Sequence, residues 1–343
     1  MSRFLPRSKR LGFRFLRHPA DVLFLLIGFL FIFTSTANVA GENKRVRIAM
    51  AISPLSSPFI IAFEKGYFKE VGLEVDIKQV KGGHLAFNTL AAGEADIATS
   101  SEAVVMFNSF KRNDFSLFCT FVNSDNDVKI LAHRDSGIRS IHDLRGKKVA
   151  TIKGTSAHFF LNHTLLMKGI AESELKISGF KPQQATHVLQ NKQFDAVTTW
   201  EPFAHLAKKE LGEDVIIVEH ERVYIETFNA ITKREYASKN KGTLIKITQA
   251  LVKANKFINS KPAETQLIVA KKLNKKLDVI KSTWDDFSFA VRLDQWLLTS
   301  LEAEARWAME NGFVKEKEMP NYLEYINLEP LKKLAPEKVT IYK

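Results

Sequence analysis

Two stretches of the chain repeat the same order of apolar runs and polar loops. In the first, the apolar run 46–52 leads into a loop rich in Ser and Pro, then into a helical pattern, and finally into residues 95–99. The second stretch begins with the apolar run 149–152 and continues through a loop that starts with glycine. Another helical pattern follows, and the stretch ends at residues 194–198. Each stretch predicts a strand, a small-residue loop, a helix and a strand that ends in hydroxyl groups, the order found in α/β lobes.

Two such lobes facing each other would form a cleft, and clefts of this kind bind small molecules. The alternative is that any two strand–helix–strand units look alike. No Pro- or Gly-rich linker follows residue 44, so short crossovers must join the lobes. Apolar residues at three- and four-residue spacing over 244–258 predict an amphipathic helix, and two more helices follow it. These C-terminal helices have no sheet of their own, so we expect them to pack back onto the first lobe.

The start of the chain has the pattern of a targeting segment. Six Lys and Arg side chains precede the unbroken apolar run 22–33, and small residues at 35–37 provide a cleavage site. Twelve apolar residues are few for a membrane span and typical of a signal peptide. We therefore expect residues 1–41 to be a signal peptide and the protein to be periplasmic or otherwise extracytoplasmic. Because the basic leader is long, an uncleaved N-terminal anchor remains an alternative.

Composition and charge narrow the classes of function. The 343 residues allow two compact units, and the 45% of apolar residues allow a sizeable core. The formal net charge of +12 falls to about +7 without residues 1–41. The chain has no dense Lys/Arg stripe, so nucleic-acid binding is not expected. A single cysteine, Cys119, excludes an intrachain disulfide and a Cys-based zinc cluster, and the nine histidines lack metal-ligand spacing. We expect no metal and no cofactor.

Hydroxyl side chains in the first stretch are candidate ligand contacts. They lie in the loop after the first strand and at the end of the second, at Ser53, Ser56, Thr99, Ser100 and Ser101. Each could equally cap a helix. Thr99 and Glu102 have the T-x-x-E spacing of a capping box, and a carboxylate at this place could instead indicate a ligand that carries an amine.

The second stretch offers a candidate anion site. Gly154, Thr155 and Ser156 lie where a strand gives way to a helix, and free amides at a helix start suit an anionic oxygen. Helix capping by one of the hydroxyls explains the same residues. His158 could add a hydrogen-bond donor or be a packed residue. Trp200 follows a strand at the expected cleft edge and offers a flat apolar wall, although a core position is also possible. No catalytic residues are expected, because G-x-S-x-G, P-loop and dinucleotide motifs are absent from the sequence.

Five motifs in order resemble the nitrate/sulfonate/taurine group of ABC-transporter substrate-binding proteins, over about residues 44–340. They are Lys65-Gly66-Tyr67-Phe68 with Gly72-Leu73-Glu74-Val75, Gly93-Glu94-Ala95-Asp96-Ile97, Asp143-Leu144-Arg145-Gly146-Lys147-Lys148-Val149-Ala150, Gly154-Thr155-Ser156-Ala157-His158-Phe159 and Trp200-Glu201-Pro202-Phe203. The resemblance implies an α/β, type II periplasmic-binding-protein fold with a ligand cleft between two lobes. It implies a first lobe of residues 44–134 plus 224–343 and a second of 135–223.

The resemblance also implies the function. The protein would capture a small anionic or zwitterionic organic solute, such as a sulfonate, taurine or nitrate, and deliver it by hinge closure to ABC permease subunits in the membrane. It would act as a monomer. The loop at 154–158 would hold the anionic head group, with Trp200 and residues 99–101 completing the pocket. Many members have a Gly- and Pro-containing loop where this chain has 99–102, which leaves the ligand's identity open.

Two other functions remain as alternatives. The same group resembles the thiamine-pyrimidine synthases, which carry a cysteine-rich motif that this chain lacks. A membrane-anchored ligand-sensing module would keep the cleft and the basic leader, although the sequence has no second apolar span and no output domain.

Overall fold

The computed structural model describes residues 45–342. The predicted signal peptide or anchor, residues 1–41, lies outside the described residues. Within the described part of the chain, no helix combines the length and the apolar character that crossing a membrane requires.

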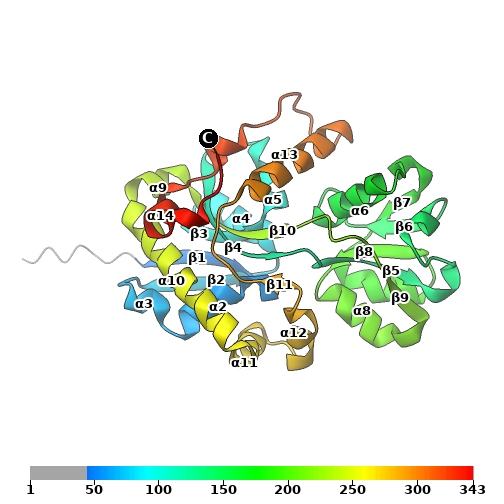
Figure 1. Ribbon diagram of the computed structural model, residues 1–343, viewed down its shortest axis with the longest axis horizontal. Coiled ribbons are helices and arrows are strands. Elements are labelled where there is room, and N and C mark those ends of the chain that lie inside the picture. Colours follow the sequence, from blue (N-terminus) through cyan, green and yellow to red (C-terminus); the bar gives the residue numbers. More distant parts are fainter. Residues whose placement is uncertain (1–44, 343) are drawn as a thin grey trace, which may run out of the picture. The chain divides into compact units, whose positions relative to one another are not determined.

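A six-stranded sheet forms the centre of the first lobe (Figure 1). Its strand order is β11 (Phe287–Ser288), β4 (Phe115–Ser124), β10 (Glu226–Lys233), β3 (Ile97–Ser101), β1 (Val46–Ala51) and β2 (Val75–Val80). Strand β1 is parallel to both β2 and β3, whereas β10 is antiparallel to β3 and β4. Strands β3 and β4 are buried along almost their whole length, as expected for strands covered by helices on both faces.

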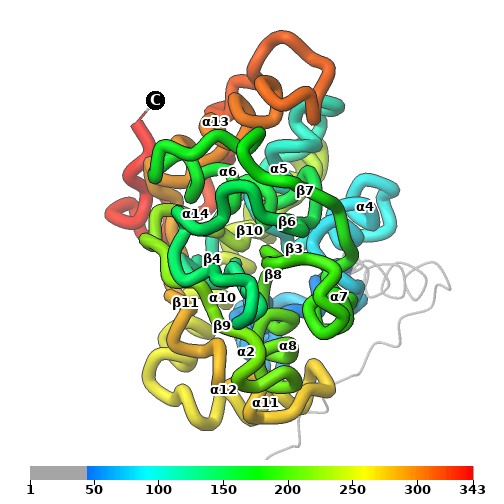
Figure 2. The backbone as a smooth tube through the Cα atoms, turned by 90° about the vertical axis from the view of Figure 1, so that its right-hand side faces the viewer, coloured from blue at the N-terminus to red at the C-terminus, as the bar shows by residue number. Residues whose placement is uncertain are grey.

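A five-stranded sheet forms the centre of the second lobe (Figure 2). Its strand order is β7 (Lys176–Gly179), β6 (Lys148–Thr151), β8 (Ala196–Trp200), β5 (Val128–His133) and β9 (Val215–Val218). Strand β6 is parallel to β7 and β8, and β5 is antiparallel to β8 and β9. Each sheet therefore has a parallel part built from the repeated strand–helix–strand pattern.

Helices cover both sheets. Those of the first lobe are α2 (Ser57–Glu64), α3 (Tyr67–Glu70), α4 (Gly83–Ala91), α5 (Glu102–Ser109), α9 (Arg234–Lys239), α10 (Lys241–Ser260), α11 (Pro262–Leu273), α12 (Leu277–Trp284), α13 (Gln295–Glu310) and α14 (Glu329–Leu334). Those of the second lobe are α6 (Ser156–Met167), α7 (Ala185–Gln190) and α8 (Phe203–Leu211). Helix α10 packs against α2 and β4, and α13 packs against α5, so the C-terminal helices cover the first sheet.

Short 3-10 turns complete the chain. They are η1 (Pro54–Ser56), η2 (Arg134–Ser136), η3 (Ile141–Leu144), η4 (Glu172–Glu174), η5 (Pro182–Gln184), η6 (Gly212–Asp214), η7 (Tyr322–Tyr325) and η8 (Pro336–Lys338). The turn η1 fills the Ser/Pro loop of the first stretch, so this loop is an ordered turn that leads directly into α2.

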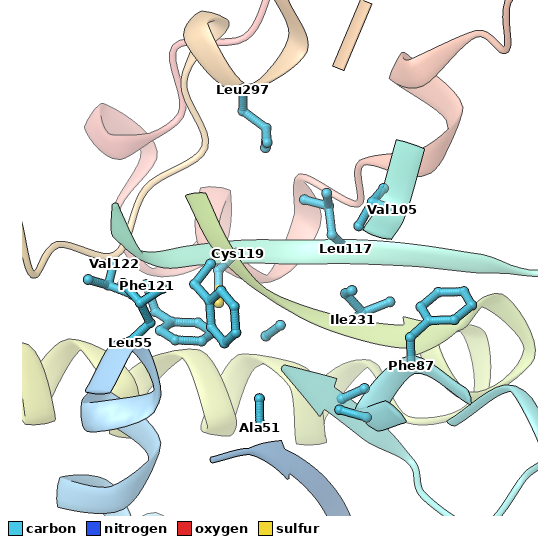
Figure 3. Close-up of a cluster of buried hydrophobic side chains, with 14 of the residues drawn as sticks. Ala51, Leu55, Phe87, Val105, Leu117, Cys119, Phe121, Val122, Ile231 and Leu297 are labelled. Atoms are coloured by element: carbon cyan, nitrogen blue, oxygen red, sulfur yellow. The ribbon is translucent and has the colours of Figure 1, made fainter. Parts of the chain in front are cut away.

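The core of the first lobe lies between its sheet and helices (Figure 3). Phe121 of β4 packs edge-on against Phe59 of α2, with ring centroids 5.0 Å apart. Cys119 lies inside the same strand and is fully buried. The single cysteine is therefore a packed core residue.

Two segments connect the lobes. Residues 125–127 lead from β4 to β5, and residues 219–225 lead back from β9 to β10. Strand β5 pairs only with strands of the second sheet, although a boundary at residue 134 would assign it to the first lobe. The chain thus changes lobe before β5, because this fully buried strand pairs on one side with β8 and on the other with β9.

Candidate functional site

The candidate residues lie at the carboxyl ends of parallel strands in both sheets. In the first lobe, Ser53 and Ser56 follow β1, and residues 99–101 form the end of β3. In the second lobe, residues 154–158 follow β6, and Trp200 is the last residue of β8. Loops at this edge of a parallel sheet are where α/β proteins bind ligands. The sequence predicted the ends of β1 and β6 to within one residue, whereas β3 and β8 each run two residues beyond the expected strands 95–99 and 194–198. Which side chains remain available there depends on their partners in the folded structure.

In the first lobe, Ser56 and Thr99 bond to the end of β1. The Ser56 hydroxyl donates to the carbonyl of Ala51 over 2.8 Å, and the Thr99 hydroxyl accepts the Ala51 amide over 2.9 Å. The two hydroxyl oxygens lie 3.4 Å apart, and both side chains are fully buried. They hold β1 against β3, and their hydrogen-bonding capacity is largely used inside the lobe.

The other first-lobe candidates have different surroundings. Ser53 caps η1 by accepting the amide of Leu55 over 3.1 Å. Ser100 is buried, and its hydroxyl has no partner among the described residues. It lies against Gly83, where an added Cβ would come within 2.5 Å of the Ser100 hydroxyl oxygen. Ser101 is the N-cap residue of α5, but its side chain makes no capping hydrogen bond.

The predicted capping box of Thr99 and Glu102 is wrong. Thr99 lies within β3, and the residue that precedes α5 is Ser101. Glu102 points into the protein, where its carboxylate accepts the Thr227 amide over 2.6 Å, the Thr227 hydroxyl over 2.9 Å and the Tyr224 hydroxyl. Its partners lie about 125 residues away in the sequence, which is why the local T-x-x-E spacing was misleading.

The start of α6 is the main polar feature of the second-lobe edge. Gly154 has a φ of 69°, a left-handed conformation that favours glycine, and Thr155 is the extended N-cap residue. The Thr155 hydroxyl donates back to the carbonyl of Ile152, so no side chain among the described residues caps this helix. Ser156 is the first helical residue. The first-turn amides therefore face the strand edge without the usual side-chain acceptor.

His158 supports this loop from inside. Its Nδ1 accepts the Gly154 amide over 3.3 Å, and its Nε2 lies 2.9 Å from the Glu172 carboxylate. The ring is 1% exposed and packs edge-on against Trp307 and Phe313, with centroids 5.2 and 5.0 Å away. Both ring nitrogens thus have protein partners, which explains why the histidine fixes the shape of the loop.

Trp200 is the last residue of β8 and is half-buried opposite Val128. The following residue, Glu201, accepts the amide of His205 at the start of α8 over 2.9 Å. Its other oxygen lies 3.1 Å from the ammonium of Lys129. Trp200 is therefore held at the strand edge by a well-anchored neighbour.

Tyr224, which the sequence did not single out, connects the two lobes' candidate loops. Its ring packs against Phe159 of α6, with centroids 5.5 Å apart, and its hydroxyl donates to Glu102 of α5. The same hydroxyl lies 3.3 Å from Glu304 of α13. Trp307, one turn further along α13, contacts His158 and Phe159. No local motif marks Tyr224, since its partners come from three distant parts of the chain.

Two α/β lobes joined by two crossover segments define the type II periplasmic-binding-protein fold. Solved structures share it. The structure of the periplasmic aliphatic sulphonate binding protein SsuA from Escherichia coli superimposes with a TM-score of 0.72 at 18% identity, covering 82% of this chain and 97% of that chain. The desulfurization enzyme DSZB superimposes with a TM-score of 0.66 at 13% identity, covering 85% and 99%.

The chain belongs to the NMT1/THI5-like family, whose model matches residues 53–265. A Bacillus subtilis relative, provisionally named as an aliphatic sulfonates-binding protein, is 26% identical over 201 residues, which is 57% of this chain. The match spans 59% of the length of that relative. The resemblance found in the sequence motifs is thereby confirmed at the level of family and fold.

Proposed function

We propose that the protein is an extracytoplasmic solute-binding protein that captures a small anionic or zwitterionic organic solute of the sulfonate type. Closure of the two lobes around the crossover segments would trap the solute, and the closed form would deliver it to ABC permease subunits. The predicted export segment at residues 1–41 fits this role, as do the sulfonate-binding names of the relative and of SsuA.

The observation that carries the proposal is the uncapped start of α6. First-turn amides, a left-handed glycine at Gly154 and the adjacent Ser156 hydroxyl form a donor-rich loop at the carboxyl edge of a parallel sheet. The positive end of the helix dipole adds to the attraction for an anion. His158 and Glu172 hold the loop in this shape, so its donors need little rearrangement on binding.

We place the chain among binding proteins, although DSZB shows that the fold also carries enzymes. Cys119 is the chain's only thiol, and its burial in β4 raises its pKa to about 12. A buried protonated thiol does not serve as a nucleophile. This supports a function without covalent chemistry at cysteine.

A screen for bound solutes tests the proposal. Thermal melting of the protein would be followed with aliphatic sulfonates, taurine, nitrate, aromatic acids and pyrimidines, each at millimolar concentration. A bound solute raises the melting temperature because it binds the folded state. A sulfonate or taurine that stabilises the protein without being consumed supports the proposal. Stabilisation by none of the compounds, or turnover of one of them, would contradict it.

A pair of substitutions at Ser156 tests the site itself. Proline is favoured at the first helical position, so Ser156→Pro should keep α6 while removing one amide donor. Ser156→Ala removes only the hydroxyl and serves as the matched control. A hydrogen bond to a charged group contributes about 1.5–3 kcal/mol, so we expect about a tenfold to hundredfold loss of affinity in the proline variant beyond that of the alanine variant. Equal affinity of the two variants by calorimetry would exclude the amide site.

Trp200→Ala tests the apolar wall. Loss of the exposed part of the indole should lower the affinity for the tightest-binding solute by about tenfold, because one face of the solute would lose its packing contact. Unchanged affinity in a folded variant would remove Trp200 from the site.

A further inference from the structure

Carboxyl groups are concentrated where the two crossover segments meet. Six acidic side chains lie within this region, and all are largely buried: Glu102, Asp127, Glu201, Glu226, Asp286 and Glu304. Among the described residues, the one ammonium that contacts the group belongs to Lys129, which lies 3.1 Å from Glu201 and 2.9 Å from Asp286. The single charge of Lys129 is shared between those two carboxylates, and the remaining four carboxyl groups have no ammonium contact within the described part of the chain.

The hydrogen bonds around Tyr224 require that one of the carboxyl groups beside it carries a proton. Glu102 accepts from the amide and hydroxyl of Thr227 and from the Tyr224 hydroxyl, and these bonds favour its ionised form against burial, which raises its pKa. The single Tyr224 proton is used in that bond. Glu304 lies 3.3 Å from the same Tyr224 oxygen, and a contact there is favourable only when Glu304 itself donates. The other oxygen of Glu304 is buried without a partner among the described residues.

A second pair of carboxyl groups lies near the first. Asp127 ends the segment that leads to β5, and Glu226 is the first residue of β10 on the returning segment. Both side chains are buried, and the charge of Asp127 helps to raise the pKa of Glu226. One oxygen of Glu226 is also buried without a partner among the described residues.

We propose that a bound proton holds the crossover region together: Glu304 donates it toward the Tyr224–Glu102 pair. This contact joins α5 and α13 to Tyr224 on the returning crossover segment. Removing the proton would place like charges next to each other in a dry environment, so the region would lose stability as pH rises.

The electrostatic surroundings favour the protonated forms. Burial raises the pKa of Glu304, and the charge of Glu102 raises it further. Burial, together with the charge of Asp127, raises the pKa of Glu226. Burial and the charge of Glu201 raise the pKa of Asp127 to about 7, while Lys129 opposes this effect. Tyr224, Tyr322 of η7 and Asp286 are the other titratable groups that face the cluster.

The sign of the pH dependence follows from these directions. A carboxyl group whose pKa is raised above the ordinary 4.5 or 3.8 binds its proton more tightly in the folded protein than in the unfolded chain. Its contribution to stability is fully present below the ordinary value and is lost as pH rises toward the folded-state pKa. For Asp127 the folded-state pKa is about 7, so most of the loss should occur below pH 7 and the remainder just above it.

Melting curves of the wild-type protein and of Glu304→Gln between pH 5 and pH 8 test the proposal. Glutamine has nearly the shape of glutamate, and its amide group donates a hydrogen bond at every pH in this range. We expect wild type and variant to melt within about 2 °C of each other at pH 5, with the variant at least about 4 °C higher at pH 8. Glu310→Gln, an exposed position on the same helix, is the control and should follow the wild-type profile. Parallel profiles for Glu304→Gln and wild type would overturn the proposal.

A second measurement covers the case in which Glu304→Gln does not fold. Calorimetric unfolding of the wild-type protein at pH 7.5 would be compared in phosphate and in Tris. Unfolding should release the bound proton, and its uptake by Tris should make the apparent unfolding enthalpy smaller than in phosphate. Equal enthalpies in the two buffers, or a larger one in Tris, would show that no such proton is held.

Discussion

The two candidate loops have similar sequences and different hydrogen-bonding states. After β1 and within β3, the hydroxyls of Ser56 and Thr99 are buried and bonded to Ala51. After β6, the Thr155 hydroxyl turns back to Ile152, and the amides at the start of α6 have no side-chain cap among the described residues. Small polar residues at a strand end therefore do not by themselves make a binding site. What matters is how many hydrogen-bond donors remain free after the loop has formed its own hydrogen bonds within the protein.

Substitutions test this difference between the two loops, because changes in the first lobe should affect stability and changes in the second lobe should affect solute affinity. The largest effect is expected from Glu102→Ala, which removes the acceptor for the Thr227 amide and for two hydroxyls. Leaving these groups buried without a partner should cost about 3 kcal/mol of unfolding free energy. Urea denaturation measures this. A loss below about 1 kcal/mol would mean that the Glu102 contacts contribute little.

Gly83→Ala should have the next largest effect. The new Cβ would lie 2.5 Å from the Ser100 hydroxyl oxygen and 3.0 Å from the Ser100 Cα, so α4 or β3 must shift. Overpacking of this kind costs about 2 kcal/mol. Ser100→Ala in the same protein removes the nearer contact and should restore part of the loss. An equally destabilised double variant would place the strain elsewhere.

Thr99→Val removes the acceptor for the Ala51 amide while keeping the shape of the side chain. We expect about 1.5 kcal/mol of destabilisation, because a buried amide loses its partner. Solute affinity in the melting assay should stay within about twofold of wild type. A large loss of affinity with little loss of stability would reverse the roles assigned to the two loops.

The smallest stability change is expected from Gly154→Ala. The nearest atom to its added Cβ is a Phe313 ring carbon at 3.9 Å, so the cost comes from the left-handed backbone, about 1 kcal/mol. A methyl group at the start of α6 should nevertheless hinder an anionic solute. Calorimetric titration with the best solute would show a larger change in affinity than in stability. The opposite result would contradict the second-lobe site.

The sequence predicted the repeated strand–helix–strand units well. The runs 46–52 and 149–152 match β1 and β6, and the predicted helix at 244–258 lies within α10 (Lys241–Ser260). Apolar spacing and glycine stops are local properties, so they can be read without the fold. The family resemblance, carried by motifs such as Lys65-Gly66-Tyr67-Phe68, is confirmed by the match over residues 53–265.

Side-chain roles were harder to predict than elements. Glu102 has the spacing of a capping box and instead bonds to Thr227, and His158 has both ring nitrogens bonded within the protein. Tyr224 has no local signature and yet contacts residues of α5, α6 and α13. The assignment of the remaining candidates to a solute site stays a prediction.

The sequence by itself determined where the strands, the helices and the small-residue loops lie, because each follows from the order of apolar and polar residues over short distances. The tertiary structure alone decided which hydroxyls are used up within the protein and which amides remain available at the start of α6. It also brought Glu304 and Glu226 into a buried cluster of carboxyl groups. Hydrogen-bond satisfaction and desolvation depend on residues far apart in the chain, so no local pattern specifies them.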